Sequence, residues 1–355
     1  MKGGAYPIVD RKRRKTRKAV SIIFAFTAVI VVALAFPTWT PSIKGENSIA
    51  TLEQVKLNGA WHEIMIRGAD RNNPIVIFVH GGPGCSEIPY VRKYQERLEK
   101  LFTVVHYDQR GSGKSHQFGE DYSGVTAGVL VKDLLSLTDF VTDRLGQSKV
   151  ILIGHSYGTY IGMQAAAASP KKFAAYIGIG QVANHHVSEL DSFAFALGQA
   201  TASDDKSDIR QLEAMRQNIE AGRDITPRSL IRKYGGAARL IDDNRDYVEG
   251  FLMNREYNLL DVIRYARGIA LTQDQLLNEE SIRPITSLVE KLELPVYFVM
   301  GAHDYMTSTS AAKAYFEALD APDKTFIVYE HSAHYPQFEE EERFAEWMGT
   351  TFRNE

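Results

Sequence analysis

Six short runs of apolar residues without polar alternation are spread along the chain, separated by stretches of helical periodicity. Such runs are typical of strands buried on both faces. Strands that alternate with helices indicate a mostly parallel sheet covered by helices on both sides. We therefore expect an α/β fold with strands at 75–80, 102–108, 150–154, 174–180, 295–301 and 325–330, and helices at about 87–100, 127–145, 157–168, 309–319 and 338–352.

Two segments depart from this alternation. The stretch EQVKLNGAWHEIMIRG alternates in polarity and turns at Asn58-Gly59, which predicts that an antiparallel hairpin opens the domain. Residues 183–290 show helical periodicity and contain no buried-strand run, so we expect a helical cap over one edge of the sheet. The core of the domain is then expected in two parts, residues 50–182 and 291–355.

The N-terminus differs from the rest of the chain. Residues 1–18 are strongly basic, and residues 19–36, AVSIIFAFTAVIVVALAF, carry no charge. As a helix this run would span about 27 Å, close to the hydrocarbon thickness of a bilayer. We expect a basic cytoplasmic tail (1–18), a transmembrane signal anchor (19–36) and a polar linker (37–49), with the remainder outside the cytoplasm. Cleavage near Ala35, giving a secreted protein, is the alternative.

Composition narrows the function classes. Cys85 is the only cysteine, so no intrachain disulfide can form, and no Cys/His cluster has the spacing of a metal site. The first 18 residues carry a net charge of +7 and the whole chain −3, which leaves −10 for the remainder. An acidic external domain argues against nucleic-acid binding.

The candidate nucleophile is Ser156, in the segment VILIGHSYGTYIGMQ. The motif Gly-x-Ser-x-Gly is weak alone, but here a buried strand precedes the serine and a helix rich in small residues follows it. Gly154 and Gly158 permit the sharp turn that would lift the serine hydroxyl above the sheet. The context therefore predicts a nucleophile rather than an ordinary turn.

A serine nucleophile needs a base, and the base needs an orienting carboxylate. In α/β-hydrolases the chain order is serine, then acid, then histidine, in loops after strands. Asp304 follows the run at 295–301, and His334 lies in the loop after 325–330, so these are the expected acid and base. His331, which adjoins the strand end, and His303 are the alternatives for the base.

Acyl chemistry also needs donors for the developing oxyanion. The segment HGGPG, residues 80–84, follows a strand directly, and its glycines leave backbone N–H groups uncovered. We expect the N–H of Gly82, or alternatively Gly81, to act together with the N–H of Tyr157. This chemistry requires no cofactor and no metal.

The segments HGGPG, YDQRGSGKS, GHSYG, GAHD and SAH, in this order, resemble the prolyl iminopeptidase branch of the α/β-hydrolases, over about residues 50–182 and 290–353. The resemblance implies Ser156 as nucleophile, Asp304 as acid and His334 as base in a serine peptidase that releases an N-terminal residue. That branch typically has Gly and Trp around the serine, where this chain has His155 and Tyr157.

Iminopeptidases bind the free amine of the substrate with carboxylates of the cap. The nearest candidate here is Glu256, in NREYN, for which a solvated surface charge is the alternative reading. We thus expect a membrane-anchored serine hydrolase acting as an aminopeptidase on short peptides. An esterase or acyl-transfer enzyme for small or lipid-derived acyl groups is the rival, and a non-catalytic binding protein is a third class. The sequence leaves the oligomeric state open.

Overall fold

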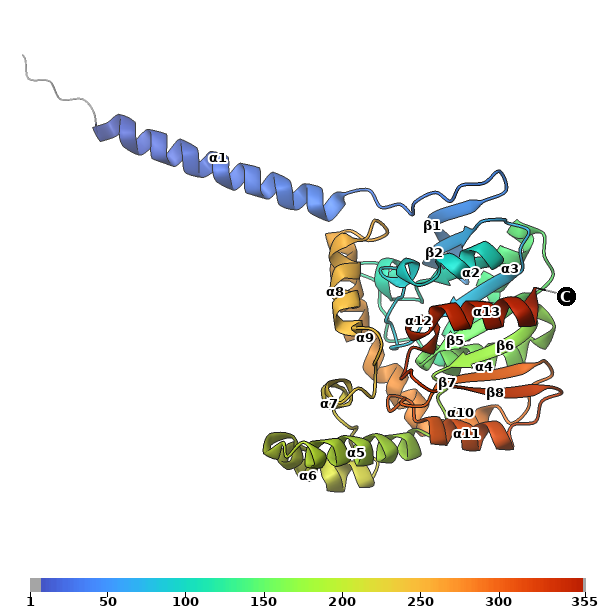
Figure 1. Ribbon diagram of the computed structural model, residues 1–355. Coiled ribbons are helices and arrows are strands. Elements are labelled where there is room, and N and C mark those ends of the chain that lie inside the picture. Colours follow the sequence, from blue (N-terminus) through green and yellow to red (C-terminus); the bar gives the residue numbers. More distant parts are fainter. Residues whose placement is uncertain (1–7, 354–355) are drawn as a thin grey trace, which may run out of the picture.

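The structure, a computed structural model, describes residues 8–353 and contains one eight-stranded sheet in the order β1-β2-β4-β3-β5-β6-β7-β8 (Figure 1). All six predicted runs form strands, and the predicted hairpin supplies two more. The strands are β1 (Ile49–Leu57), β2 (Ala60–Gly68), β3 (Ile75–Val79), β4 (Thr103–Tyr107), β5 (Val150–His155), β6 (Phe173–Ile179), β7 (Val296–Gly301) and β8 (Lys324–Tyr329).

The sheet is antiparallel at one end and parallel elsewhere. Strand β2 pairs antiparallel with β1 and with β4, whereas every other pairing from β4 to β8 is parallel. The turn between β1 and β2 has Asn58 at φ 44° and Gly59 at φ 83°, as a tight hairpin turn requires. Because parallel strands end at the same edge, the loops after β3, β5, β7 and β8 meet there.

Helices cover both faces of the sheet. Alternate side chains of one strand serve two different cores: Ile75 and Ile77 pack with helix α3 residues such as Leu134, while Val76 and Phe78 join the cluster that contains Phe344 of α13. The helices of the α/β core are α2 (Glu96–Leu101), α3 (Ala127–Leu145), α4 (Tyr157–Ala168), α11 (Thr309–Ala318), α12 (Pro336–Glu339) and α13 (Glu341–Phe352). Short 3₁₀ turns lie at Val91–Lys93, Gly113–Ser115 and Pro170–Lys172.

The helix expected at 87–100 was predicted too long. In that range, only a 3₁₀ turn and the first five residues of α2 are helical. Ile88 precedes Pro89, and the residue before a proline is disfavoured in helical geometry. The intervening loop instead carries Glu87 into the protein interior, where this side chain is 2% exposed.

Residues 183–290 are helical, with α5 (His185–Ala202), α6 (Lys206–Glu220), α7 (Arg228–Lys233), α8 (Asp243–Met253), α9 (Leu259–Ile282) and α10 (Ile285–Leu288). Helix α5 packs against α6 through a small core of its own, which includes Ala196 and Leu212. A capping box between Asn258 and Asp261 begins α9. The boundaries of the cap and of the two core parts stay predictions.

Helix α1 (Ile8–Ala35) projects away from the body of the protein (Figure 1). The first seven residues of the expected tail, 1–18, lie outside the described part of the chain. Within residues 8–353, no helix has a stretch that is both long and apolar enough to cross a membrane. The transmembrane prediction for 19–36 is therefore not confirmed.

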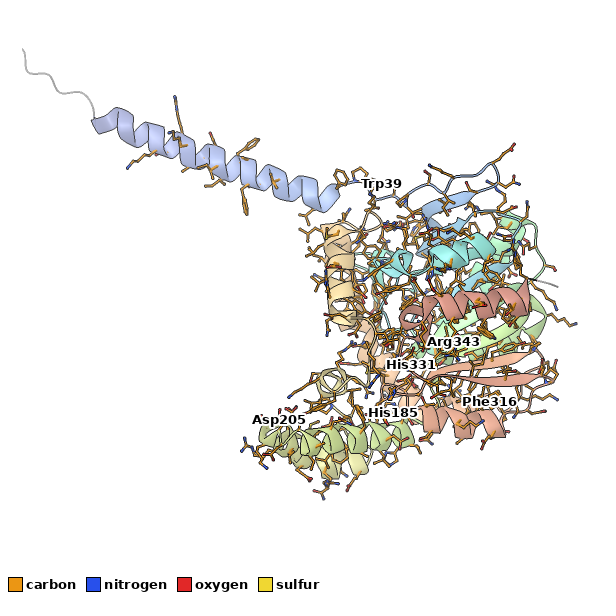
Figure 2. The ribbon with its side chains drawn as sticks, viewed as in Figure 1. Trp39, His185, Asp205, Phe316, His331 and Arg343 are labelled. Atoms are coloured by element: carbon orange, nitrogen blue, oxygen red, sulfur yellow. The ribbon has the colours of Figure 1, made fainter. Side chains whose placement is uncertain are left out.

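The segment after α1 is packed on the body. Trp39 lies where α1 meets the body (Figure 2), and its backbone N–H donates to the backbone carbonyl of Arg255 at 2.9 Å. The side chain of Asn258 donates to the carbonyl of Phe36, and Lys114 donates to the hydroxyl of Thr38, both at 2.9 Å. The expected linker, 37–49, is thus bound to the domain at its start.

Candidate active site

Ser156 occupies a strained turn between β5, which ends at His155, and α4, which begins at Tyr157. Its φ of 54° and ψ of −128° are rare for any residue other than glycine. A hydrogen bond of 2.9 Å from its N–H to the carbonyl of Ile179 holds this backbone. A Cβ added to Gly158 would lie 1.9 Å from the carbonyl oxygen of Val79, so only glycine permits this approach of helix to strand.

Asp304 and His334 are brought together from the loops after β7 and β8. His334 Nδ1 lies 2.9 Å from Asp304 Oδ2, and both side chains are buried. Asp304 Oδ1 accepts hydrogen bonds from the N–H groups of Met306 and Thr307, and Oδ2 accepts one from the Thr307 hydroxyl. Because the carboxylate is the acceptor, Nδ1 carries the proton in neutral His334 and Nε2 keeps its lone pair.

The pKa values of this pair leave both groups in the forms that a base and its orienting acid require. Burial lowers the pKa of His334 below its ordinary value and outweighs the attraction of Asp304. Burial acts to raise the pKa of Asp304, but the attraction of His334 in its protonated form and the hydrogen bonds from His334 and Thr307 outweigh it, so that this pKa is lowered. Near neutral pH, Asp304 is ionised and His334 is neutral.

A cavity of about 850 Å³ lies over this edge of the sheet, and both Ser156 and His334 line it. Gly81, Gly82 and Tyr157, the predicted oxyanion donors, line the same cavity. By contrast, His303 and His331 border a separate hollow. The structure therefore groups His334 with the candidate nucleophile, as predicted, while the catalytic roles themselves stay predictions.

The HGGPG loop is held close to the candidate nucleophile. A Cβ on Gly81 would lie 2.7 Å from the Cβ of Ser156, so a side chain there would displace the serine. His80 accepts the N–H of Gln109 at Nε2, and the Gln109 side chain donates to the carbonyl of His80. Burial lowers the pKa of His80 to about 4, so this imidazole is neutral. The motifs HGGPG and YDQRG, distant in sequence, thus meet through His80 and Gln109.

Glu256, the candidate for binding the substrate amine, is not at the cavity. Its carboxylate is 1% exposed and accepts hydrogen bonds from Thr40 and Arg92, each at 3.0 Å. It therefore ties the segment after α1 to the helical region. The interpretation of Glu256 as a solvated surface charge is wrong as well, because the side chain is buried in an ion pair.

Other carboxylates line the cavity, and sequence reasoning missed them. Glu189 on α5 is bound by Arg228 and by the N–H of Thr226. Glu280 on α9 is 6% exposed, and the charges that act on its carboxylate are those of Arg228 and Glu189. Burial raises the pKa of Glu280 to about 7. No local pattern marks Glu280, because it reads as one of many charged residues on a long helix.

The described residues contain no group of three or more His, Cys, Asp or Glu side chains that could hold a metal ion.

The family described as alpha/beta hydrolase fold matches residues 74–341 of this chain. The chain therefore belongs to the α/β-hydrolase fold family. Its relatives include proteins named as an aminopeptidase and as proline iminopeptidases.

A curated relative, "Probable aminopeptidase YbaC" of Bacillus subtilis (strain 168), is 29% identical over 327 residues, which cover 88% of this chain and 99% of the relative. A "Proline iminopeptidase" of Neisseria gonorrhoeae is 32% identical over 97 residues, 27% of this chain and 29% of the relative. The solved structure of a proline iminopeptidase-related protein from Thermus thermophilus superposes with a TM-score of 0.57 at 20% identity, over 85% of this chain and 96% of that one.

Proposed function

We propose that this protein is a serine aminopeptidase that uses Ser156, His334 and Asp304 to release the N-terminal residue of short peptides. The observation that carries the proposal is the buried Asp304–His334 pair facing the same cavity as a serine at a strained strand-to-helix turn. The full-length match to a probable aminopeptidase supports the choice of substrate class.

In the proposed reaction, His334 Nε2 takes the proton of the Ser156 hydroxyl while the Oγ atom bonds to the carbonyl carbon of the scissile amide. The N–H groups of Gly82 and Tyr157 bind the oxyanion, an interaction worth about 3 kcal/mol for each donor. The C–N bond then breaks, and His334 returns the proton to the departing amine. Water repeats these steps on the acyl-enzyme and frees Ser156.

The substrate amine needs an anionic partner in the cavity, and Glu280 is the proposed one. Glu189 forms an ion pair with Arg228, whereas the attraction of Arg228 on Glu280 is too weak to offset the effect of burial. A substrate ammonium at this point would supply the missing charge and would keep Glu280 ionised. Glu280 lies on α9, so the helical region would select substrates by their free amino terminus.

The test is a panel of aminoacyl-naphthylamides and acyl nitrophenyl esters, assayed with the full-length chain and with Ser156→Ala. Turnover of the amides, lost in Ser156→Ala, is expected. Labelling of Ser156 by a fluorophosphonate probe shows separately whether the nucleophile is active. Turnover of short esters alone would replace the peptidase assignment with the esterase alternative, and absence of labelling would favour a binding protein.

We also propose that residues 19–36 anchor the protein in a membrane, with the hydrolase domain outside the cytoplasm. The uncharged sequence of this run, its basic flank and the projection of α1 from the body support the proposal. Membrane fractionation and protease accessibility in intact cells test it. Recovery of a soluble extracellular form that begins just after Ala35 would show instead that the segment is a cleaved signal peptide.

A further inference from the structure

His155 directly precedes the candidate nucleophile, and its side chain makes two hydrogen bonds in the interior. Nδ1 lies 2.8 Å from Glu87 Oε1, and Nε2 lies 3.1 Å from the backbone carbonyl oxygen of His334. The rings of His155 and His334 are 4.9 Å apart between centroids. His155 therefore joins the turn that carries Ser156 to the loop that carries the base.

Both partners of His155 are acceptors, so both of its ring nitrogens must donate. A carbonyl oxygen has no proton to give, and the carboxylate of Glu87 is ionised when it accepts. A neutral imidazole has one N–H only, whereas an imidazolium has two. The two contacts together describe a buried His155 imidazolium whose counter-ion is Glu87.

The groups around Glu87 agree with this assignment. His106 Nδ1 lies 3.8 Å from Glu87 Oε2, and its Nε2 faces the side-chain oxygen of Gln95 at 2.8 Å. Burial lowers the pKa of His80 and of His106 to about 4, so both rings are neutral at pH 7. Burial acts to raise the pKa of Glu87, but this pKa is lowered, and the hydrogen bond and the attraction of His155 are the largest influences that lower it. Of the three histidines that act on the pKa of Glu87, His155 is then the one that carries the charge of the ion pair.

We propose that His155 is a positioning residue: as a buried imidazolium paired with Glu87, it fixes the backbone of His334 beside Ser156 and keeps the base in its neutral form. The inference rests on the proposed roles of Ser156 and His334. A glycine before the nucleophile could do neither task, so the histidine of the GHSYG segment gains a specific function.

The ring of Tyr335 lies 5.2 Å from that of His334, and three charged groups shift the pKa of His334 in different directions. Asp304 raises its pKa, whereas His155 and Arg232 lower it. Burial is the largest influence and also lowers that pKa. Loss of the His155 charge therefore moves the titration of the base to higher pH.

Two substitutions separate the charge of His155 from its hydrogen bond. The amide nitrogen of glutamine reaches the position of Nε2, so His155→Gln keeps a donor for the His334 carbonyl but removes the charge. The amide nitrogen of asparagine matches Nδ1, so His155→Asn keeps the bond to Glu87 and loses the bond to His334. His331→Asn, in the same loop as His334 but bordering another hollow, is the matched control.

With acyl esters as substrates, whose acid limb is set by His334, we expect that limb of the kcat/KM profile to move up by about one pH unit in both His155 variants and to stay in place in His331→Asn. The plateau kcat should fall by less than about tenfold in His155→Gln and by about 100-fold in His155→Asn, because a base displaced by about 1 Å loses that much rate. A purely structural role would lower the melting temperature of both variants and leave the acid limb unmoved, which would overturn the proposal.

The protonation of His155 is measurable without turnover. In ¹⁵N-detected NMR of the wild-type chain with labelled histidine, assigned through His155→Gln, both ring nitrogens of His155 should resonate as N–H at pH 7. A neutral His155 would refute the proposal even in an active enzyme. A charged His155 in an enzyme without turnover or probe labelling would instead place the failure in the proposed function.

Discussion

Asp304→Asn is the sharpest test of the proposed relay, because the structure dictates which way the new amide must face. Asp304 Oδ1 accepts two backbone N–H groups, from Met306 and Thr307, so the amide oxygen of asparagine takes this position. The NH₂ group is then at the Oδ2 position, 2.9 Å from His334 Nδ1. Since NH₂ is a donor, Nδ1 must become the acceptor and the ring proton must move to Nε2.

The expected loss follows from that tautomer. With a proton on Nε2, His334 cannot accept the proton of Ser156, and the stabilising charge of Asp304 on the developing imidazolium is also lost. A wrong-tautomer substitution of this kind costs about 10⁴-fold in kcat, or about 5 kcal/mol of transition-state stabilisation. Stability should change little, because the substitution preserves shape and both backbone hydrogen bonds to Oδ1.

The assay is kcat for the best substrate of the panel at pH 8, with thermal unfolding of each variant measured alongside. Asp320→Asn, an exposed aspartate in a surface ion pair, is the matched control and should retain full activity. A stably folded Asp304→Asn protein that keeps more than one tenth of wild-type kcat would refute the assignment of Asp304 as the orienting acid.

Three further outcomes follow from the same geometry. Glu280→Gln should raise KM for aminoacyl amides at least tenfold and leave KM for acyl esters unchanged. In the wild-type enzyme, the pH profile for amides should show an added acid limb near pH 7, because Glu280 must be ionised to bind the amine. The acid limb for esters should lie below pH 6.5, where His334 becomes protonated. Equal effects on both substrate classes would contradict this role. Gly180→Ala should lower kcat at least tenfold, because its Cβ would lie 2.9 Å from His334 Nδ1 at a φ of 53°, and unchanged kinetics would show that the pair tolerates displacement. Glu256→Gln should leave KM unchanged and lower the free energy of unfolding by about 1–3 kcal/mol in chemical denaturation; a raised KM at unchanged stability would return Glu256 to the substrate site.

Much of this architecture could be predicted because it depends on patterns of neighbouring residues in the sequence. Uninterrupted apolar runs marked the buried strands, and Asn58-Gly59 marked the hairpin turn. Ser156, Asp304 and His334 could be singled out because each lies in a loop that follows a predicted strand, and parallel strands end at one edge of the sheet. The order of residues along the chain and the ends of the strands can be predicted without any knowledge of the tertiary packing.

Local pattern misled where a side chain's surroundings come from distant segments. Glu256 was the nearest candidate in the sequence for an amine-binding carboxylate of the cap, yet Thr40 and Arg92, more than 160 residues earlier in the chain, bind its carboxylate away from the cavity. Glu280 reads as a surface charge on a long helix, yet α9 turns it inward. His155 read as a departure from a family motif, and its charge depends on Glu87, 68 residues away.

Hydrophobic period and chain order therefore predicted the strands of the sheet and the loops at its edge, and they singled out the three residues of the proposed relay. The choice of amine-binding carboxylate, the burial of Glu256 and the protonation of His155 arose only when the helices packed on the sheet. The physical reason is that a pKa and a binding role depend on desolvation and on the nearest opposite charge. Both are set by contacts between segments that lie far apart in the sequence.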